Sequence, residues 1–324
     1  MVRTLKFQDI NVPVPGFGAM GFSQSYGTAV DSESHQTLSK ALELGCTFWD
    51  SAAIYGKGHN EQLIGEWIKR NPEARDKVFI ASKCGIHLDD GKIDNSKAHI
   101  EEYIDNSIQR LGFTPDLYYI HRIEPGRALE ESVGTLQSLK EKGKCKYIGL
   151  SECGAATLRK ACSIAHIDAL QIEYSPWYTD HEQNGLIDTA KELGVTVIAY
   201  SPLGKGILTG KYTSADQFPK GDVRRTIPRF SEELLGKNLK IVHEFQKLAE
   251  KKRCTPGQLA LAWVIAQGAI PIPGTKNAIR LAENWGAGDV DLSEDELKEI
   301  RTLIEEAKPE GARYNAQQLA AVGH

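Results

Sequence analysis

The feature of this sequence that most constrains its fold is an eightfold alternation of short apolar runs with amphipathic stretches. The runs are rich in β-branched and aromatic residues, which is typical of buried strands, and the stretches between them have helical spacing. The expected strands are Gly16–Met20, Thr47–Ser51, Val78–Ser82, Leu117–His121, Tyr147–Ser151, Leu170–Tyr174, Val195–Tyr200 and Ala269–Pro273. Eight successive βα units favour an α/β fold in which the strands close into a (β/α)8 TIM barrel.

Helices are expected between these strands, and several are followed by a glycine of the kind that ends helices. Examples are Ser34–Leu44, Ala98–Leu111, Leu129–Glu141 and Leu186–Leu193. No linker-like stretch interrupts the pattern. We therefore expect residues 1–324 to form a single barrel domain, a size that this fold commonly reaches.

Two segments do not belong to the repeat. Leu5–Pro13 has extended pieces around a turn-like Gln8–Asn11, which predicts a β-hairpin that caps the bottom of the barrel. Leu203–Gly236 is too long for an ordinary connection and is rich in Gly, Pro and basic residues. We expect it to be a functional or mobile loop that clamps the cofactor. Its basic residues are interpreted as a solvated or cofactor-clamping surface, in preference to a site for a phosphate or an acidic partner; they are Lys220, Arg224, Arg225 and Arg229.

Composition excludes several classes of protein. The formal net charge of -4 gives no reason to expect a nucleic-acid partner. Met1–Val12 lacks the apolar core of a signal peptide, and the most apolar stretch, Leu259–Ile272, is too short and interrupted to cross a membrane. The six cysteines lack paired spacing, so we expect no zinc site, no other metal and no disulfides, but reduced thiols in a cytoplasmic protein. Cys84 is interpreted as a packed free thiol.

Polar residues stand at the carboxyl ends of the expected strands. In a barrel these ends converge on the face where active sites are built. The residues are Asp50, Lys83, His121, Ser151, Gln171 and Tyr200. Tyr55 follows Asp50 by a loop short enough to bring the phenol back over the strand ends.

These side chains have the chemistry needed to reduce a carbonyl. Hydride addition builds negative charge on oxygen, so a proton donor must stand close to it. A phenol can serve if its pKa is lowered, and we expect Lys83 to lower the pKa of Tyr55 while Asp50 keeps Lys83 charged. His121 is expected to hydrogen-bond and orient the carbonyl oxygen. Each residue alone has an ordinary structural interpretation, but their convergence favours catalysis.

Local motifs around these residues resemble the aldo-keto reductases. They are Gly45–Ala52, Tyr55, Ala81–Lys83, Leu117–Arg122, Tyr147–Ser151 and Val197–Gly204. The similarity extends from about Leu5 to Arg313, and the family's catalytic residues are Asp, Tyr, Lys and His in this order. The resemblance implies the barrel fold and NADPH-dependent reduction of aldehydes or ketones to alcohols, with hydride from nicotinamide C4 and a proton from Tyr55.

Two nucleotide-binding motifs are rejected. Gly16–Gly21 satisfies G-x-G-x-x-G, but a Rossmann site needs a helix to begin at once, and helix signals begin only near Asp31. We interpret the glycines as points of close backbone approach at the first strand end, where Met20 and Gly21 are assigned to the cofactor. Leu203–Lys211 misses the spacing of a P-loop.

The resemblance assigns the remaining cofactor contacts. Asp50 lies beside the nicotinamide, Tyr200 stacks on it, and Ser151 and Gln171 hold its carboxamide. The pyrophosphate is assigned to Ser201, Pro202, Leu203, Gly204, Lys205, Gly206, Leu208 and Gly210, a glycine-rich segment that can cradle it with backbone N–H groups. One departure is Glu152, which stands where relatives often carry Asn.

A site for the 2′-phosphate is expected near a helix N-terminus with two cations. It comprises Gly274, Thr275, Lys276, Arg280, Glu283 and Asn284. Many relatives carry Lys-Ser where this chain has Gly274-Thr275, so the preference for NADPH over NADH depends on Lys276 and Arg280.

Two alternatives to a reductase stay open. A lysine at a strand end can form a Schiff base, as in lyase or aldolase barrels, and some relatives are NADPH-binding regulatory subunits. The expected partner is a small carbonyl substrate, with no obligate protein partner. Substrate choice is expected to depend on Ser23–Tyr26, Ile86–Ile93, Arg122–Arg127, Trp177 and the tail after Ala307, with Tyr26 and Trp177 in a partly apolar pocket.

Overall fold

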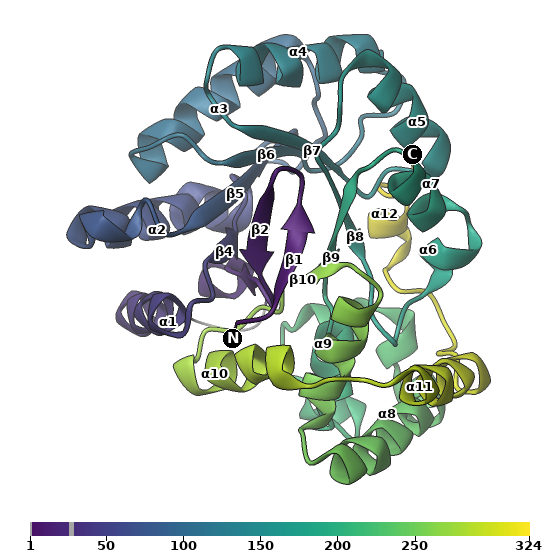
Figure 1. Ribbon diagram of the computed structural model, residues 1–324. Helices are drawn as coiled ribbons and strands as arrows, with labels where there is room; N and C mark the ends of the chain where they lie inside the picture. Colours follow the sequence, from purple (N-terminus) through teal and green to yellow (C-terminus); the bar gives the residue numbers. More distant parts are fainter. Residues whose placement is uncertain (1, 26–28) are drawn as a thin grey trace.

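The computed structural model describes residues 2–25 and 29–324, and its centre is an eight-stranded parallel sheet (Figure 1). In spatial order the strands are β3 (Phe17–Gly18), β4 (Phe48–Asp50), β5 (Phe79–Cys84), β6 (Leu117–Ile120), β7 (Tyr147–Ser151), β8 (Ala169–Glu173), β9 (Thr196–Tyr200) and β10 (Ile270–Pro271). A parallel bridge from Gly18 to Gly274 joins the two edges, and Gly16 N donates to Pro271 O at 2.9 Å. These contacts close the (β/α)8 TIM barrel, as the alternating sequence pattern predicted.

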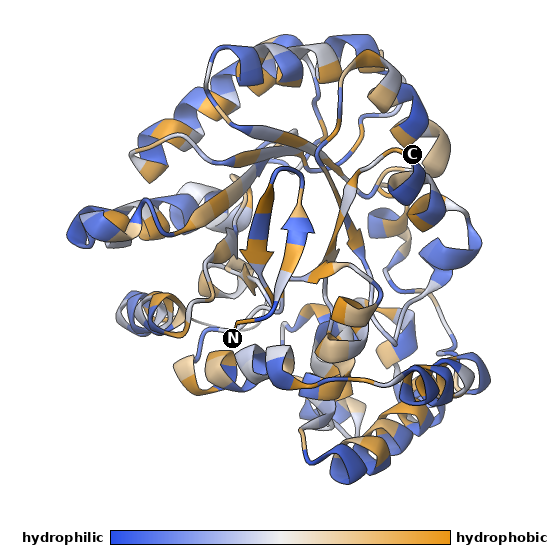
Figure 2. Ribbon diagram, in the orientation of Figure 1, coloured by the Kyte–Doolittle hydropathy of each residue, from blue (hydrophilic) through white to orange (hydrophobic). Residues whose placement is uncertain are grey.

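Helices surround the strands. They are α1 (Asp31–Leu44), α2 (His59–Arg70), α3 (Lys97–Leu111), α4 (Leu129–Glu141), α5 (Ala155–Ile164), α6 (Asp180–Gln183), α7 (Leu186–Glu192), α8 (Glu232–Lys252), α9 (Pro256–Ala266), α10 (Ala278–Trp285), α11 (Glu294–Glu306) and α12 (Ala316–Leu319). Figure 2 shows mostly apolar strands inside helices that carry both apolar and polar residues. Among the described residues, no helix combines the length and apolarity required to cross a bilayer.

The first and last strands of the barrel are shorter than predicted. Only Phe17–Gly18 forms β3, and the chain continues as a 3-10 turn, η1 (Met20–Phe22). At β10 the predicted Ala269–Pro273 shrinks to Ile270–Pro271. Pro271 and Pro273 lack the N–H groups that a longer ladder would require.

The N-terminal hairpin closes the bottom of the barrel, as predicted. It consists of β1 (Thr4–Phe7) and β2 (Ile10–Pro13). Because Phe7 pairs with Ile10, the turn comprises only Gln8–Asp9, and the predicted four-residue turn Gln8–Asn11 is wrong. Phe7 is fully buried and lies 5.3 Å from Phe79 and 5.0 Å from Tyr147, between ring centroids, so the hairpin fills the barrel end with aromatic side chains.

The long segment after β9 is folded more tightly than its composition indicated. It contains η4 (Gly204–Thr209), η5 (Ala215–Gln217), η6 (Val223–Thr226) and η7 (Pro228–Phe230), and α8 already begins at Glu232. Phe218 and Phe230 are buried, and they pack edge to face. The expectation of a solvated basic surface is wrong for Arg224 and Arg229, which are only 4% and 6% exposed, because both lie over buried rings or backbone carbonyls.

Candidate active site

The strand ends bring the predicted polar side chains to one mouth of the barrel. Asp50 ends β4, Lys83 lies at the end of β5, and His121 directly follows β6. Ser151 and Tyr200 end β7 and β9, and Gln171 lies in β8 opposite Ser151. Parallel strands place all their carboxyl ends at the same edge, which is why residues spread over 150 positions meet here.

Lys83 is the centre of a buried hydrogen-bond network. Its side chain is fully buried, and Nζ contacts a carboxylate oxygen of Asp50, Ser51 O at 2.7 Å and the Tyr55 phenol at 3.3 Å. The other Asp50 oxygen accepts a hydrogen bond from Gln171 Nε2 at 2.8 Å. All three ammonium protons therefore have acceptors, and the ion pair is satisfied away from water.

This network sets the protonation of the lysine and the phenol. Burial opposes the charge on Lys83, but Asp50 and Tyr55 outweigh it, so the pKa of Lys83 lies above its ordinary value. Burial also raises the pKa of Tyr55, and Lys83 opposes that rise without cancelling it. The prediction that Lys83 brings the phenol below its ordinary pKa is therefore wrong for the protein alone, because loss of water around the phenolate has the larger effect. Tyr55 holds its proton at neutral pH.

His121 stands beside the phenol with an uncharged ring. Its imidazole meets the Tyr55 ring edge to face, with centroids 5.8 Å apart. Burial lowers the pKa of His121 well below its ordinary value, and the cations Arg122 and Lys83 lower it further. A neutral imidazole next to a protonated phenol can offer a hydrogen bond to an oxygen without adding positive charge.

Arg122 is a site residue whose contacts sequence reasoning missed. Its Nη1 donates to His121 O at 2.6 Å and to Ser151 Oγ at 3.3 Å, so it joins the ends of β6 and β7. Its position directly after His121 could have indicated that Arg122 belongs to the site, but from the sequence Arg122 was assigned only to a loop that affects substrate choice. The Ser151 hydroxyl, predicted to hold a carboxamide, already has this partner.

A second buried charge cluster occupies the other side of the mouth. Arg313, from the C-terminal tail, bonds to Glu152 after β7 and, at 3.1 Å, to Glu173 at the end of β8. Lys205 Nζ lies 2.5 Å from the other Glu173 oxygen. Burial disfavours the Glu152 carboxylate, yet Arg313 outweighs it and lowers the pKa of Glu152 to about 2. Glu152 adopts a left-handed backbone (φ 56°), and its side chain is engaged by the tail.

The tail crosses the mouth in contact with the predicted nicotinamide residue. The Tyr314 hydroxyl lies 2.8 Å from that of Tyr200, and Lys205 Nζ stands 4.7 Å from the centroid of the Tyr314 ring. Beyond α12 the chain pairs with the loop after β7, where Gly323 N donates to Glu152 O at 2.8 Å. Figure 1 shows this yellow segment running from α11 past α12 toward α5 and α7.

The predicted pyrophosphate segment lies at the end of β9 in a coiled form. Gly204, Lys205 and Gly206 all have positive φ, and Gly206 N and Leu208 N donate to Leu203 O at 3.0 and 3.2 Å. The expectation that these two amides face a phosphate is therefore not met in this conformation, because the segment satisfies them itself. Ser201, Pro202 and Gly210 flank the same coil.

The predicted 2′-phosphate residues lie beside the first strand end. The bridge between Gly274 and Gly18 brings Thr275 and Lys276 near the segment that carries Met20 and Gly21. Arg280 and Glu283 are exposed on α10, whereas Asn284 is buried. The Asn277 side chain accepts from Ile279 N and Arg280 N, so part of the helix N-terminus is already capped.

Two aromatic residues, Tyr26 and Trp177, were expected in the substrate pocket. Trp177 is 2% exposed and stacks against Phe230, so most of its side chain is packed in the core, although it also borders a small cleft with Tyr178 and Arg229. Tyr26 lies outside the described residues. Cys84 is buried, and burial raises the pKa of its thiol to about 12, which confirms a packed, unreactive cysteine.

The sequence is similar to known proteins over nearly its whole length. The sequence model of the Aldo/keto reductase family matches residues 16–305. An aldo-keto reductase of Gibberella moniliformis is 52% identical, with 100% of both chains covered. Aldo-keto reductase yakc of Schizosaccharomyces pombe, whose name specifies NADP(+), is 42% identical, with 97% of this chain and 94% of the relative covered.

Solved structures agree with this result. The glycerol dehydrogenase AKR11B4 from Gluconobacter oxydans superposes with a TM-score of 0.86 at 26% identity, covering 95% of this chain and 96% of that one. The thermostable aldo-keto reductase Tm1743, in complex with the inhibitor epalrestat, gives 0.75 at 28% identity over 94% and 99%. The chain belongs to the aldo/keto reductase family and is an NAD(P)H-dependent oxidoreductase that acts on small carbonyl compounds.

Proposed function

We propose that this protein reduces aldehydes or ketones to alcohols with NADPH and that Tyr55 donates the proton. The observation that carries the proposal is the contact of Lys83 Nζ with both Asp50 and, at 3.3 Å, the Tyr55 phenol. This contact places a proton donor beside a positively charged group, and both side chains are buried. Phenolate formation is costly there without such a charge.

Tyr55 and His121 have different roles toward the carbonyl oxygen: Tyr55 donates a proton to it, and His121 donates a hydrogen bond. Tyr55 is protonated at neutral pH and stands ready to donate. When the proton leaves, Lys83 stabilises the phenolate, and Asp50 with Gln171 keeps the lysine in place. His121 is neutral and offers a hydrogen bond that orients the oxygen. The reduced nicotinamide, when bound, supplies the hydride.

The residues around the mouth fit a dinucleotide with an additional phosphate. Ser151 and Gln171 offer hydroxyl and amide groups beside the Asp50–Lys83 pair, which suits a carboxamide. Lys276 and Arg280 supply positive charge after the bridge of Gly274 to Gly18, which suits the 2′-phosphate, whereas Lys205 at the predicted pyrophosphate segment is paired with Glu173. The NADP(+) in the name of the S. pombe relative supports the same choice. Six free cysteines support a cytoplasmic location.

The decisive experiment follows the oxidation of NADPH and of NADH by the purified protein with a panel of aromatic, aliphatic and sugar aldehydes. We expect oxidation that requires a carbonyl and is faster with NADPH at limiting cofactor. Tight NADPH binding without oxidation of any member would contradict the proposal and indicate a regulatory subunit. A borohydride-trapped substrate adduct on Lys83 would indicate Schiff-base chemistry, which the fully engaged, charged Lys83 disfavours.

A further inference from the structure

Outside the barrel mouth, two imidazoles and a carboxylate converge on one point. His87 and Asp94 belong to the loop that joins β5 to α3, and His99 belongs to the first turn of α3. One possible ligand atom from each lies within 4.8 Å of the other two. His87 Nε2 is 3.3 Å and His99 Nδ1 is 3.9 Å from the same oxygen of Asp94. The three side chains therefore surround a common centre.

The loop holds its two ligands in a fixed arrangement. Ile86 and Ile93 form an antiparallel bridge, His87 N donates to Lys92 O at 2.8 Å, and Asp94 N donates to Gly85 O at 3.1 Å. This small hairpin sets His87 and Asp94 side by side. The third ligand comes from a different element, so any ion that joins them also joins the loop to α3.

Neighbouring contacts orient the ligand atoms toward the centre. Ser96 N donates to Asp94 Oδ1 at 2.8 Å, and Arg127 Nη2 lies 3.5 Å from that oxygen, which leaves Oδ2 for the imidazoles. The His99 ring stacks on Tyr103 with centroids 3.8 Å apart. Such outer contacts are the kind that fix a metal ligand in place.

The two separations from the Asp94 oxygen fit a tetrahedral metal site. A metal ion with ligands at 2.0–2.1 Å in a tetrahedron holds neighbouring ligand atoms about 3.3 Å apart. The 3.3 Å separation equals that edge, and the 3.9 Å separation requires only a small shift. His99 is 5% exposed, and it is Nδ1 that faces the Asp94 oxygen.

We propose that His87, Asp94 and His99 bind one divalent transition-metal ion of the zinc type, which fastens the β5–α3 loop to α3. Two nitrogens and one oxygen suit zinc and its neighbours, whereas magnesium and calcium take all-oxygen sites. The sequence-based expectation of no metal relied on the spacing of cysteines, and this site uses none.

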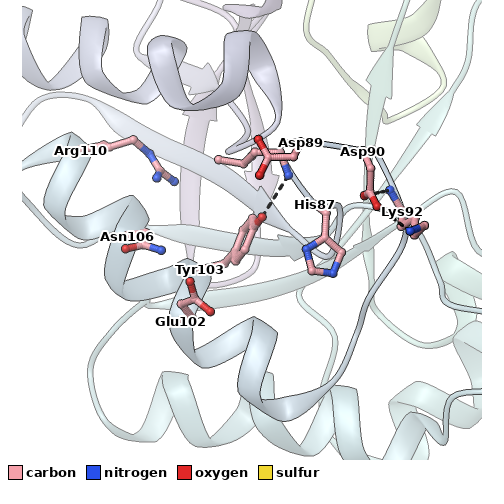
Figure 3. A pocket seen from close by; sticks show the side chains of 9 residues that line it. His87, Asp89, Asp90, Lys92, Glu102, Tyr103, Asn106 and Arg110 are labelled. Atoms are coloured by element: carbon pink, nitrogen blue, oxygen red, sulfur yellow. Dashed lines mark hydrogen bonds and ion pairs between the residues drawn. The ribbon is translucent and has the colours of Figure 1, made fainter.

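A cleft lies beside the site, and of the three proposed ligands His87 lines it. The cleft has a volume of about 470 Å³, and its lining includes His87, Tyr103 and Glu102. Figure 3 shows His87 between Asp90 and Lys92 on one side and Tyr103 of α3 on the other. Water or a small anionic ligand from this cleft can complete the coordination.

The site is placed to stiffen one wall of the barrel mouth. The loop begins directly after the strand that carries Lys83. Asn95 N donates to Glu124 Oε2 at 2.7 Å, and Glu124 N donates to Asn95 Oδ1 at 2.8 Å, which ties the loop to the one that follows His121. An ion at the cluster therefore anchors two loops that follow proposed catalytic residues.

The test titrates ZnCl2 into the full-length protein after removal of metals with a chelator, by calorimetry, with the thiols kept reduced. We expect one equivalent to bind to the wild type and to raise its melting temperature. In His87→Gln and in His99→Gln the affinity should fall by more than the roughly 10- to 100-fold that loss of an outer-shell partner costs. His243→Gln, on an exposed position of α8, should keep the full equivalent.

The same titration can overturn the proposal. No bound equivalent in the wild type would do so, as would full affinity in either His87→Gln or His99→Gln. Zinc that binds unchanged to both variants and is lost when Cys162 and Cys254 are alkylated would show a thiol site instead. His87 is 42% exposed, so His87→Gln should fold even if the buried His99→Gln does not.

Discussion

The barrel mouth contains two buried charge clusters, and they differ in what their charges face. In the first, Lys83 binds Asp50 and leaves one proton for the Tyr55 phenol. In the second, Arg313 forms ion pairs with Glu152 and Glu173, and Lys205 forms an ion pair with Glu173. Both clusters have balanced formal charges, but in the first the ammonium group also contacts the Tyr55 phenol, a group that can donate a proton. The second joins the tail to the strand ends.

The comparison indicates that burial and ion pairing alone do not identify a catalytic group. Both clusters have side chains less than a tenth exposed, and both lie at the ends of strands on the same face. The difference is the place of the phenol: Tyr55 is bonded to Lys83 beside His121, whereas the Tyr200 hydroxyl, 3.3 Å from Arg313 Nη1, is also hydrogen-bonded to Tyr314 of the tail. We therefore expect substitutions in the first cluster to act on turnover, and those in the second to act on stability.

The largest expected effect is that of Lys83→Met on turnover. Without the ammonium group the phenolate loses its stabilising charge, and kcat should fall by about 10²- to 10⁴-fold, the usual range for acid–base catalysis. Steady-state assays with a reactive aldehyde measure this loss. Arg313→Met is the matched control, since it also removes a buried cation at the mouth; an equal fall in kcat there would contradict the distinction between the clusters.

Arg313→Met should instead lower the free energy of unfolding by about 3–5 kcal/mol, because it leaves two buried carboxylates with one cation fewer. Urea denaturation followed by circular dichroism measures the change. Arg159→Met removes an exposed pair with Glu192 and should have little effect on the same curve. Similar curves for the two variants would show that the tail does not stabilise the fold.

The second cluster should also make stability depend on acid pH. The pKa of Glu152 is lowered to about 2 in the folded protein, so its contribution is fully present above the unfolded value of about 4.5 and is lost as pH falls toward 2. At about 1.4 kcal/mol per unit, the contribution is about 3 kcal/mol. Unfolding of wild type and Glu152→Gln should differ above pH 5 and converge in acid. A constant difference would mean that Glu152 is not the responsible group.

A smaller effect is expected from Arg280, which lies outside both clusters on the exposed face of α10. Arg280→Ala should weaken NADPH by about tenfold or more, as for a hydrogen bond to a charged group, and should leave NADH nearly unchanged. Fluorescence titration with each cofactor measures both affinities. Equal losses would remove the argument that this residue recognises the 2′-phosphate.

The smallest effect is expected from Cys84→Ala, next to Lys83 on the same strand but facing the outer core. A buried thiol with a pKa near 12 has almost no thiolate at neutral pH, so it should resist alkylation and play no part in turnover. Mass spectrometry after brief treatment with iodoacetamide should find Cys84 unmodified. A fall in kcat comparable to that of Lys83→Met would mean that the neighbouring residue has been misassigned.

The sequence predicted what depends on local pattern. The strands that carry Asp50, Lys83 and His121 were recognised from apolar runs of ordinary length, and parallel strand ends must meet. The second cluster was not found because Arg313 reaches Glu152 across 161 positions, and nothing in the tail marks that contact. The burial of Arg229 was missed for the same reason: its partners are backbone carbonyls of Trp177 and Gly311.

The pKa of Tyr55 was misjudged for a different reason. The sequence showed the cation beside the phenol but not the extent of burial, and burial has the larger effect. The His87–Asp94–His99 cluster was overlooked because its ligands are spaced irregularly and become neighbours only through the small hairpin after β5.

The central claim, that the Lys83-linked phenol supplies the proton, is tested most directly by Tyr55→Phe. The measurement compares oxidation of bound NADPH by a reactive aldehyde in this variant and in wild type, with NADPH affinity determined separately. We predict that the affinity is retained, because the ring still packs against His121, and that turnover falls by about 10²- to 10⁴-fold. Turnover close to that of wild type would show that the proton comes from another group and would contradict the account.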